Sequence, residues 1–279
     1  MRVTSSDQVS VAIHEFGGAG RPLLWSHATG FHAWCYLPIA DRLDSTFSSF
    51  GLDYRGHGDT ASNEGWDGDW EKYGDDAVAA ARAVAPDGGL IGFGHSMGAT
   101  GLLMAAHREP DLFDLVIGFE PIVFPEPYET GRGPNDPPPI IEQARHRRPV
   151  FDSFEDAVEN YASKPPFSAV DPDMLRLYVA HGFRSAPEGV RLKCSPEHEA
   201  MTFEGGALHR TWDVLPEIET RCVIVGSGDT EGPGRVAEGI AERLPNSLFI
   251  HQPDANHFGP FVDPDGTADF VLDVTADLR

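Results

Sequence analysis

The chain has 279 residues, of which 41% are hydrophobic and 23% are charged, a balance typical of a folded globular protein. Lysine and arginine together number 21 against 44 aspartates and glutamates, which gives a formal net charge of −23 at pH 7. A surface this acidic repels nucleic-acid phosphates and anionic membranes, and the composition therefore argues against both as partners.

Short β-like runs alternate with helix-like segments along the first 120 residues. The runs predicted as strands are Val9–Gly17, Arg21–Ala28, Thr46–Gly56, Gly89–His95 and Asp114–Glu120, and the segments predicted as helices are Ala33–Leu43, Trp70–Ala85 and Met97–Glu109. This alternation predicts an α/β fold, with a mostly parallel, doubly wound sheet covered by helices on both faces.

The alternation stops after Pro121 and resumes near Pro216. The stretch between them carries a stiff turn at Asn135–Pro139 and two amphipathic segments, Ser153–Ser163 and Asp171–Phe183, with no convincing strand. The strands expected after it are Arg221–Asp229 and Asn246–His257, with a helix at Gly232–Pro245 between them. A loop of roughly 95 residues without structure is improbable inside one sheet. We therefore predict a helical cap at residues 121–216, inserted into a core domain of residues 1–120 and 217–279.

The segment Gly94-His95-Ser96-Met97-Gly98 joins a predicted strand to a predicted helix. A Gly-x-Ser-x-Gly sequence in this context is typical of a nucleophilic serine, because the tight turn lifts the hydroxyl clear of the sheet. The following helix N-terminus favours developing negative charge. We expect Ser96 to be the nucleophile.

A serine needs a general base, and the base needs an orienting acid. His257, in the loop after the last predicted strand, is the expected base. Two carboxylates could orient it. Asp229 lies just past an apolar strand and is the first choice, and Glu120, at the end of the strand after the nucleophile helix, is the alternative.

The oxyanion hole requires two backbone N–H donors. Met97, directly after the serine, supplies one, and the turn after an early strand supplies the other from Ala28 or Thr29. The side chains expected to shape the substrate pocket are His27, His95, Phe31 and Phe124. The basic run Ala144–Arg148 could attract a carboxylate, but its pattern is more typical of a solvated helix face.

No apolar stretch reaches the ~18 residues of a membrane span, and the segment Met1–Gly17 has no signal-peptide pattern. The three scattered cysteines predict neither a disulfide framework nor a zinc site. We expect a cytoplasmic protein with no metal and no cofactor, whose partner is a small-molecule substrate. A monomer and a homodimer are both compatible with the sequence.

The order of the segments "SHATGF", "DYRGHGDT", "GHSMGA", "VGSGDT" and "NHFGP" resembles that of the α/β-hydrolase fold superfamily, in particular its members with a cap. The resemblance covers the chain apart from the cap. Two departures concern His27-Ala28, where the superfamily usually has His-Gly, and Glu120, which offers an acid after the earlier strand as in a subset similar to lactone-cleaving members. A serine at position 96 argues against the dehalogenase and epoxide hydrolase activities found in this fold.

These observations predict a serine hydrolase that cleaves a carboxylic ester or lactone of a small, largely hydrophobic molecule through an acyl-enzyme. A carbon–carbon bond hydrolase or a perhydrolase would use the same residues with a different pocket. A non-catalytic small-molecule receptor of the same fold is the third alternative.

Overall fold

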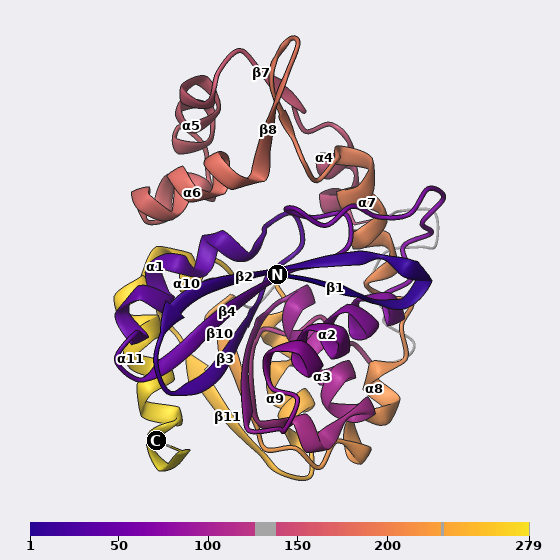
Figure 1. Ribbon diagram of the computed structural model, residues 1–279, viewed down its shortest axis with the longest axis vertical. Helices are drawn as coiled ribbons and strands as arrows, with labels where there is room; N and C mark the ends of the chain where they lie inside the picture. The colour runs from indigo at the N-terminus through magenta and orange to yellow at the C-terminus, as the bar shows by residue number, and fades with distance from the viewer. Residues whose placement is uncertain (126–137, 230–231, 279) are drawn as a thin grey trace.

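A computed structural model describes residues 1–125, 138–229 and 232–278. Within these ranges an eight-stranded sheet forms the centre of the molecule, in the order β1-β2-β4-β3-β5-β6-β10-β11 (Figure 1). Its strands are β1 (Arg2–Thr4), β2 (Ser10–Gly18), β3 (Arg21–Ser26), β4 (Phe47–Asp53), β5 (Leu90–His95), β6 (Phe113–Phe119), β10 (Cys222–Ser227) and β11 (Ser247–Gln252). Strand β2 is antiparallel to β1 and β4, and the remaining pairs are parallel.

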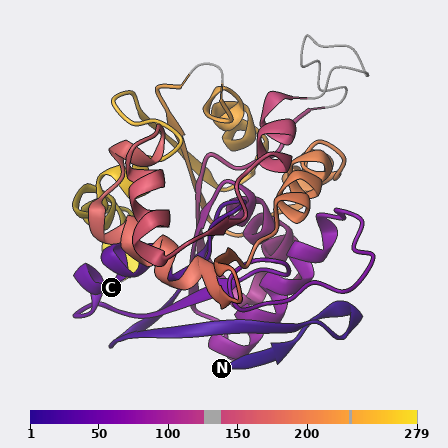
Figure 2. The same ribbon diagram turned by 90° about the horizontal axis from the view of Figure 1, so that it is seen from above.

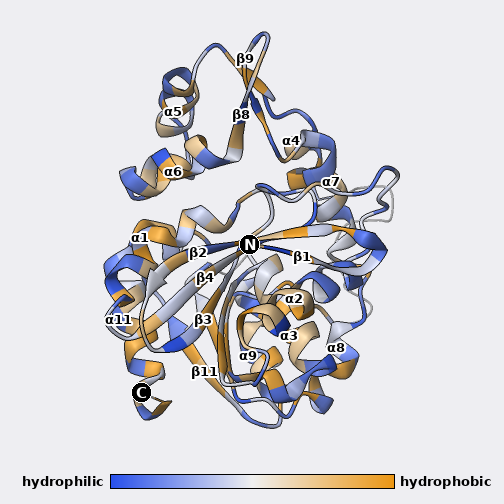
Figure 3. Cartoon of the chain, viewed as in Figure 1, coloured by the Kyte–Doolittle hydropathy of each residue, from blue (hydrophilic) through white to orange (hydrophobic). Residues whose placement is uncertain are grey.

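Helices cover both faces of this sheet. On one face lie α2 (Glu71–Val84), α3 (Met97–Arg108), α8 (Thr211–Val214) and α9 (Gly234–Arg243), and on the other lie α1 (Leu37–Ala40), α10 (Gly259–Val262) and α11 (Pro264–Val274). The hydrophobic residues of the central strands and of the inner helix faces meet between the layers (Figure 3). Every residue of β5 is buried, as expected for a central parallel strand covered on both sides. The predicted doubly wound, mostly parallel sheet is confirmed.

One predicted helix of the core is broken into three short pieces. The segment Ala33–Leu43 forms a 3₁₀-helix at Ala33–Tyr36, the four-residue α1 and a second 3₁₀-helix at Asp41–Leu43. Pro38 lies in the first turn of α1, where proline is tolerated because it has no N–H to donate to a preceding turn. In one continuous α-helix, Pro38 could not donate the backbone hydrogen bond to the carbonyl four residues earlier. The three short segments avoid this loss.

Within the predicted cap, α8 packs against α3 on one face of the sheet. The segment of residues 138–205, called the cap region below, lies above the end of the sheet that carries Ser96 (Figures 1 and 2). It contains α4 (Pro139–Arg145), α5 (Phe154–Ala162), α6 (Pro172–Gly182) and α7 (Pro196–Gly205). The last three are preceded by the N-cap residues Ser153, Asp171 and Ser195, whose side chains accept hydrogen bonds from backbone N–H groups of the first turn. Most of the stiff turn predicted at Asn135–Pro139 lies outside the described residues.

This cap region also contains three strands that the sequence did not predict. Strands β7 (Val150–Phe151), β9 (Gly189–Leu192) and β8 (Phe183–Ala186) form a small antiparallel sheet in that order. They are two to four residues long, too short for an alternating pattern to be recognised. None of the helices in the described ranges has the length and apolar character that crossing a bilayer would require.

Buried histidines give a prediction for stability against pH. His32 and His198 are 2% and 8% exposed, and burial lowers the pKa of each to about 4. An unfolded chain has histidine pKa values of about 6.5, so it binds protons that the folded protein excludes as the pH falls from about 6.5 to about 4. The stability due to the neutral side chains is therefore complete above that window and is lost as the pH falls through it.

We expect each of these histidines to remove about 1 kcal/mol of unfolding free energy per pH unit within the window, measured by urea unfolding at several pH values. The variant His198→Asn should show a shallower decline. The control variant His146→Asn, whose side chain is 79% exposed, should keep the slope of the unaltered protein. Equal slopes in all three proteins would contradict this account.

Candidate active site

Ser96 occupies a strained turn between β5 and α3. Its φ and ψ of 57° and −117° lie outside the regions that most residues adopt. A Cβ atom at Gly94 would come within 2.4 Å of the Ala99 Cα, and one at Gly98 within 2.2 Å of the Ser26 carbonyl oxygen. The glycines therefore allow the close packing that forms the turn, which presents Ser96 at the N-terminus of a 12-residue helix.

His257, in the loop after β11, forms a hydrogen bond with Glu120. The distance from its Nδ1 to Oε2 of Glu120 is 2.5 Å. An ionised carboxylate only accepts hydrogen bonds, so Nδ1–H is the donor and Nε2 of the neutral ring is left with a lone pair. Both His257 and Ser96 line the same pocket. This tautomer is the one that can accept a proton from a serine.

The Glu120 carboxylate is buried at the end of β6, where its backbone has a φ of +48°. Its second oxygen, Oε1, accepts a hydrogen bond of 2.8 Å from the N–H of Ser227 at the end of β10. Burial alone would raise the pKa of Glu120, but the hydrogen bonds from His257 and Ser227, and the positive charge that His257 carries when it is protonated, outweigh burial and hold that pKa below its usual value. Glu120 is therefore ionised at neutral pH.

Asp229, the first choice for the acid in the sequence, lies in the turn after β10. Its Oδ1 accepts a 3.2 Å hydrogen bond from the N–H of Gly232, and its own N–H donates to the Ser227 hydroxyl. These are the contacts of a residue that stabilises a turn. The carboxylate that the structure places against His257 is Glu120, the alternative of the sequence analysis.

His95 connects the core to the loop that carries His257. Its Nε2 lies 2.8 Å from the His257 carbonyl oxygen, and its Nδ1 lies 3.0 Å from the Tyr36 hydroxyl. Because a carbonyl only accepts, Nε2 carries the proton and Nδ1 accepts from Tyr36. Burial lowers the pKa of His95, which agrees with this neutral form. The Tyr36–His95 pair thus fixes the backbone of His257.

The three residues predicted for the oxyanion hole lie around Ser96. Met97 is buried at the first position of α3, where helix N–H groups have no partner within the helix. Ala28 and Thr29 line the pocket together with Ser96. His27 is buried beneath this turn, where Nε2 accepts from the N–H of Tyr54 and Nδ1 lies 2.9 Å from the Ala28 carbonyl oxygen. Its contacts hold the turn in place.

The pocket has a volume of about 330 Å³ and lies between the core loops and the cap region. Phe31 and His95, both predicted as pocket residues, line it. The Phe31 ring packs against those of Phe261 and Tyr178 at centroid distances of 4.8 and 5.2 Å. The other two residues predicted for the pocket, the buried His27 and the half-buried Phe124, are not among the lining residues in the described part of the chain.

Two charged side chains that the sequence analysis did not place in the site also line the pocket. Arg147, from the basic run Ala144–Arg148, forms an ion pair with Glu199 of α7. The expected solvated helix face is therefore wrong for Arg147, although its neighbour Arg148 has a side chain that is 52% exposed. The sequence shows a basic residue at position 147, but no local sequence pattern indicates that α7 covers this side chain.

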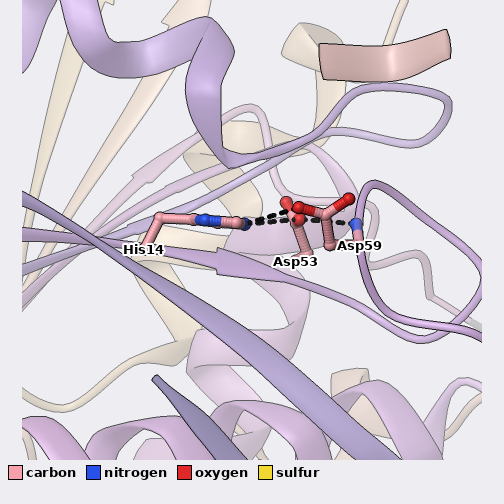
Figure 4. Close-up of side chains that lie close together, drawn as sticks. All are labelled: His14, Asp53 and Asp59. Atoms are coloured by element: carbon pink, nitrogen blue, oxygen red, sulfur yellow. Dashed lines mark hydrogen bonds and ion pairs between the residues drawn. The ribbon is translucent and has the colours of Figure 1, made fainter. Parts of the chain in front are cut away.

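Figure 4 shows a second cluster of polar side chains, formed by His14, Asp53 and Asp59. None of the three lines the pocket. In the described residues this cluster is the one group whose ligand atoms are close enough together to hold a metal ion. Asp53 already accepts from His14 Nε2 and from the N–H groups of Ala33 and Asp59, each at 2.8 Å. Lys193 Nζ lies 2.6 Å from Oδ1 of Asp59. These contacts supply partners from the protein to both carboxylates and stabilise the turn after β4.

A doubly wound sheet, a serine on a strained strand-to-helix turn and a histidine held by a buried carboxylate together define an α/β hydrolase. Residues 23–270 match the model of the Alpha/beta hydrolase family. The chain therefore belongs to that family.

Individual relatives agree with this assignment. The chain is 25% identical over 257 residues to 2-(acetamidomethylene)succinate hydrolase of Mesorhizobium japonicum, which covers 90% of this chain and 86% of that protein. The crystal structure of E-2-(acetamidomethylene)succinate hydrolase is similar with a TM-score of 0.80 at 22% identity, over 98% of this chain and 97% of that one. A thermophilic esterase from Thermogutta terrifontis is similar with a TM-score of 0.73 at 19% identity, over 99% and 98% of the two chains. The two solved structures share the fold.

Proposed function

We propose that this hydrolase cleaves a carboxylic ester or lactone of a small, largely hydrophobic molecule through an acyl-enzyme on Ser96. The observation that carries the proposal is the buried Glu120–His257 hydrogen bond, in the same site as a serine on a strained turn. The aromatic walls of the pocket support an apolar substrate.

In the proposed reaction His257 Nε2 takes the Ser96 hydroxyl proton while Oγ attacks the substrate carbonyl carbon. Glu120 accepts the hydrogen bond from Nδ1 and stabilises the imidazolium that forms. The N–H of Met97, with that of Ala28 or Thr29, stabilises the negative oxygen of the tetrahedral intermediate. The imidazolium then protonates the leaving alkoxide. Water, deprotonated by His257, releases the acid and restores Ser96.

A second candidate is hydrolysis at a bond other than an ester. It is supported by the similarity to 2-(acetamidomethylene)succinate hydrolase, whose named substrate carries an acetamido group. The same serine, base and oxyanion donors would serve that reaction, because an amide carbonyl passes through a similar tetrahedral intermediate.

A fluorophosphonate probe tests the proposed nucleophile directly, since it phosphonylates a serine only where a base and an oxyanion hole activate the hydroxyl. We expect one probe per chain, on the peptide that contains Ser96, by mass spectrometry of the intact and digested protein. The variant Ser96→Ala should take up none. Labelling of another residue, or equal labelling of the variant, would refute the assignment.

A further inference from the structure

Arg147 and Glu199 form an ion pair in the wall of the pocket, on the side of the cap region. We propose that this pair selects substrates with an uncharged group that both accepts and donates hydrogen bonds, such as a carboxamide or a ureide. The inference rests on the proposed function, because it concerns the substrate of the same site.

Most N–H donors of the Arg147 guanidinium form hydrogen bonds with side chains of the cap region. Nη2 donates to the hydroxyls of Tyr161 and Tyr178 at 2.9 and 2.5 Å, and Nη1 donates to Oε2 of Glu199. An arginine has five N–H donors. Within the described residues, Nε–H and one N–H of Nη1 have no hydrogen-bond acceptor from the protein. These two do not lie on a common edge of the guanidinium, which is the arrangement that a bidentate carboxylate needs. Arg147 can thus give a ligand single hydrogen bonds.

The carboxylate of Glu199 keeps an acceptor for a ligand. Oε2 accepts from Arg147, whereas no described residue donates to Oε1. Oε1 lies against Gly30, next to the oxyanion turn, where a Cβ atom would come within 2.5 Å of it. Gly30 has a φ of +78°, which favours glycine. The backbone at this point therefore makes room for the carboxylate at the pocket wall.

The charges of the pair cancel, and both side chains are largely removed from water, with 18% of the Arg147 and 8% of the Glu199 side chain exposed. A carboxylate from the substrate would add an unpaired negative charge beside Glu199, which is costly in such a site. A neutral amide adds no charge, accepts from Arg147 through its oxygen and donates to Glu199 through its N–H. The surrounding rings of Phe167 and Phe203 suit an apolar remainder of the substrate.

The test compares kcat/KM for three p-nitrophenyl esters of equal length, whose acyl chains end in a carboxamide, a carboxylate or an isopropyl group. For the unaltered protein we expect the carboxamide ester to exceed the carboxylate ester by about tenfold or more. In Glu199→Gln the charge of Arg147 is no longer balanced, and the preference should invert in favour of the carboxylate. The variant Glu204→Gln, on the same helix but with its ion pair to Arg145 on the surface, should keep the original order.

A preference of the unaltered protein for the carboxylate ester would overturn the inference. So would an equal loss on all three esters in Glu199→Gln, because that result would assign the pair a purely structural role. Calorimetric binding of hexanamide and hexanoate to Ser96→Ala separates this inference from the reaction. Tighter binding of hexanamide by Ser96→Ala, together with no ester turnover by the unaltered protein, would support the recognition and refute ester hydrolysis. Tighter binding of hexanoate would refute the recognition whatever the reaction is.

Discussion

Alanine at position 96 is expected to lower kcat for a p-nitrophenyl ester by about 10⁴-fold to 10⁶-fold, because the variant loses the nucleophile and with it the acyl-enzyme. Only the oxyanion donors and substrate binding would then accelerate the reaction. The measurement is the steady-state release of p-nitrophenol by purified protein, with circular dichroism and thermal unfolding to establish that the variant is folded.

The matched control for this variant is Ser163→Ala. The Ser163 hydroxyl donates to the carbonyl of Asn160 on the exposed surface of the cap region, and we expect its removal to leave kcat within about twofold. If Ser96→Ala kept activity comparable to this control, Ser96 could not be the nucleophile and the proposed mechanism would fail as a whole.

Glutamine at position 120 is expected to lower kcat by about 10³-fold to 10⁴-fold. A neutral amide cannot stabilise the imidazolium, and if its NH₂ faces Nδ1 the ring is held in the tautomer whose Nε2 carries the proton and cannot accept one from Ser96. In the structure Glu120 also accepts from Ser227, so unfolding of the variant has to be measured alongside its kinetics. The amide of glutamine can still accept that bond through its oxygen, and the fold should survive.

Asp229→Asn is the matched comparison, because it makes the same chemical change in a carboxylate whose Oδ1 accepts from the N–H of Gly232. An asparagine oxygen can accept the same bond, and we expect kcat to fall less than about tenfold. A large loss in Asp229→Asn with little change in Glu120→Gln would make Asp229 the acid.

Much of the fold could be predicted because its signals are local. The strand before Ser96 is a short apolar run and the helix after it has helical periodicity, so β5 and α3 lie within one residue of the predicted bounds. The strands β7, β8 and β9 escaped prediction because two to four residues carry no readable pattern. Pro38 similarly divided a segment whose periodicity favoured one helix.

The sequence by itself determined the strand-turn-helix context of Ser96 and the place of His257 after the last strand, since both follow from short segments and their neighbours. Which carboxylate contacts His257 was decided by the tertiary structure. Glu120 and His257 are 137 residues apart, and they meet because β6, β10 and β11 are adjacent parallel strands whose carboxyl ends share one edge of the sheet.

The same holds for Arg147 and Glu199, which are 52 residues apart and lie on separate segments of the cap region. The basic run Ala144–Arg148 has the pattern of a solvated surface, but the packing of α7 largely buries the Arg147 side chain. The burial of a charge and the identity of its partner depend on contacts between distant segments, and the order of the residues along the chain does not encode those contacts locally.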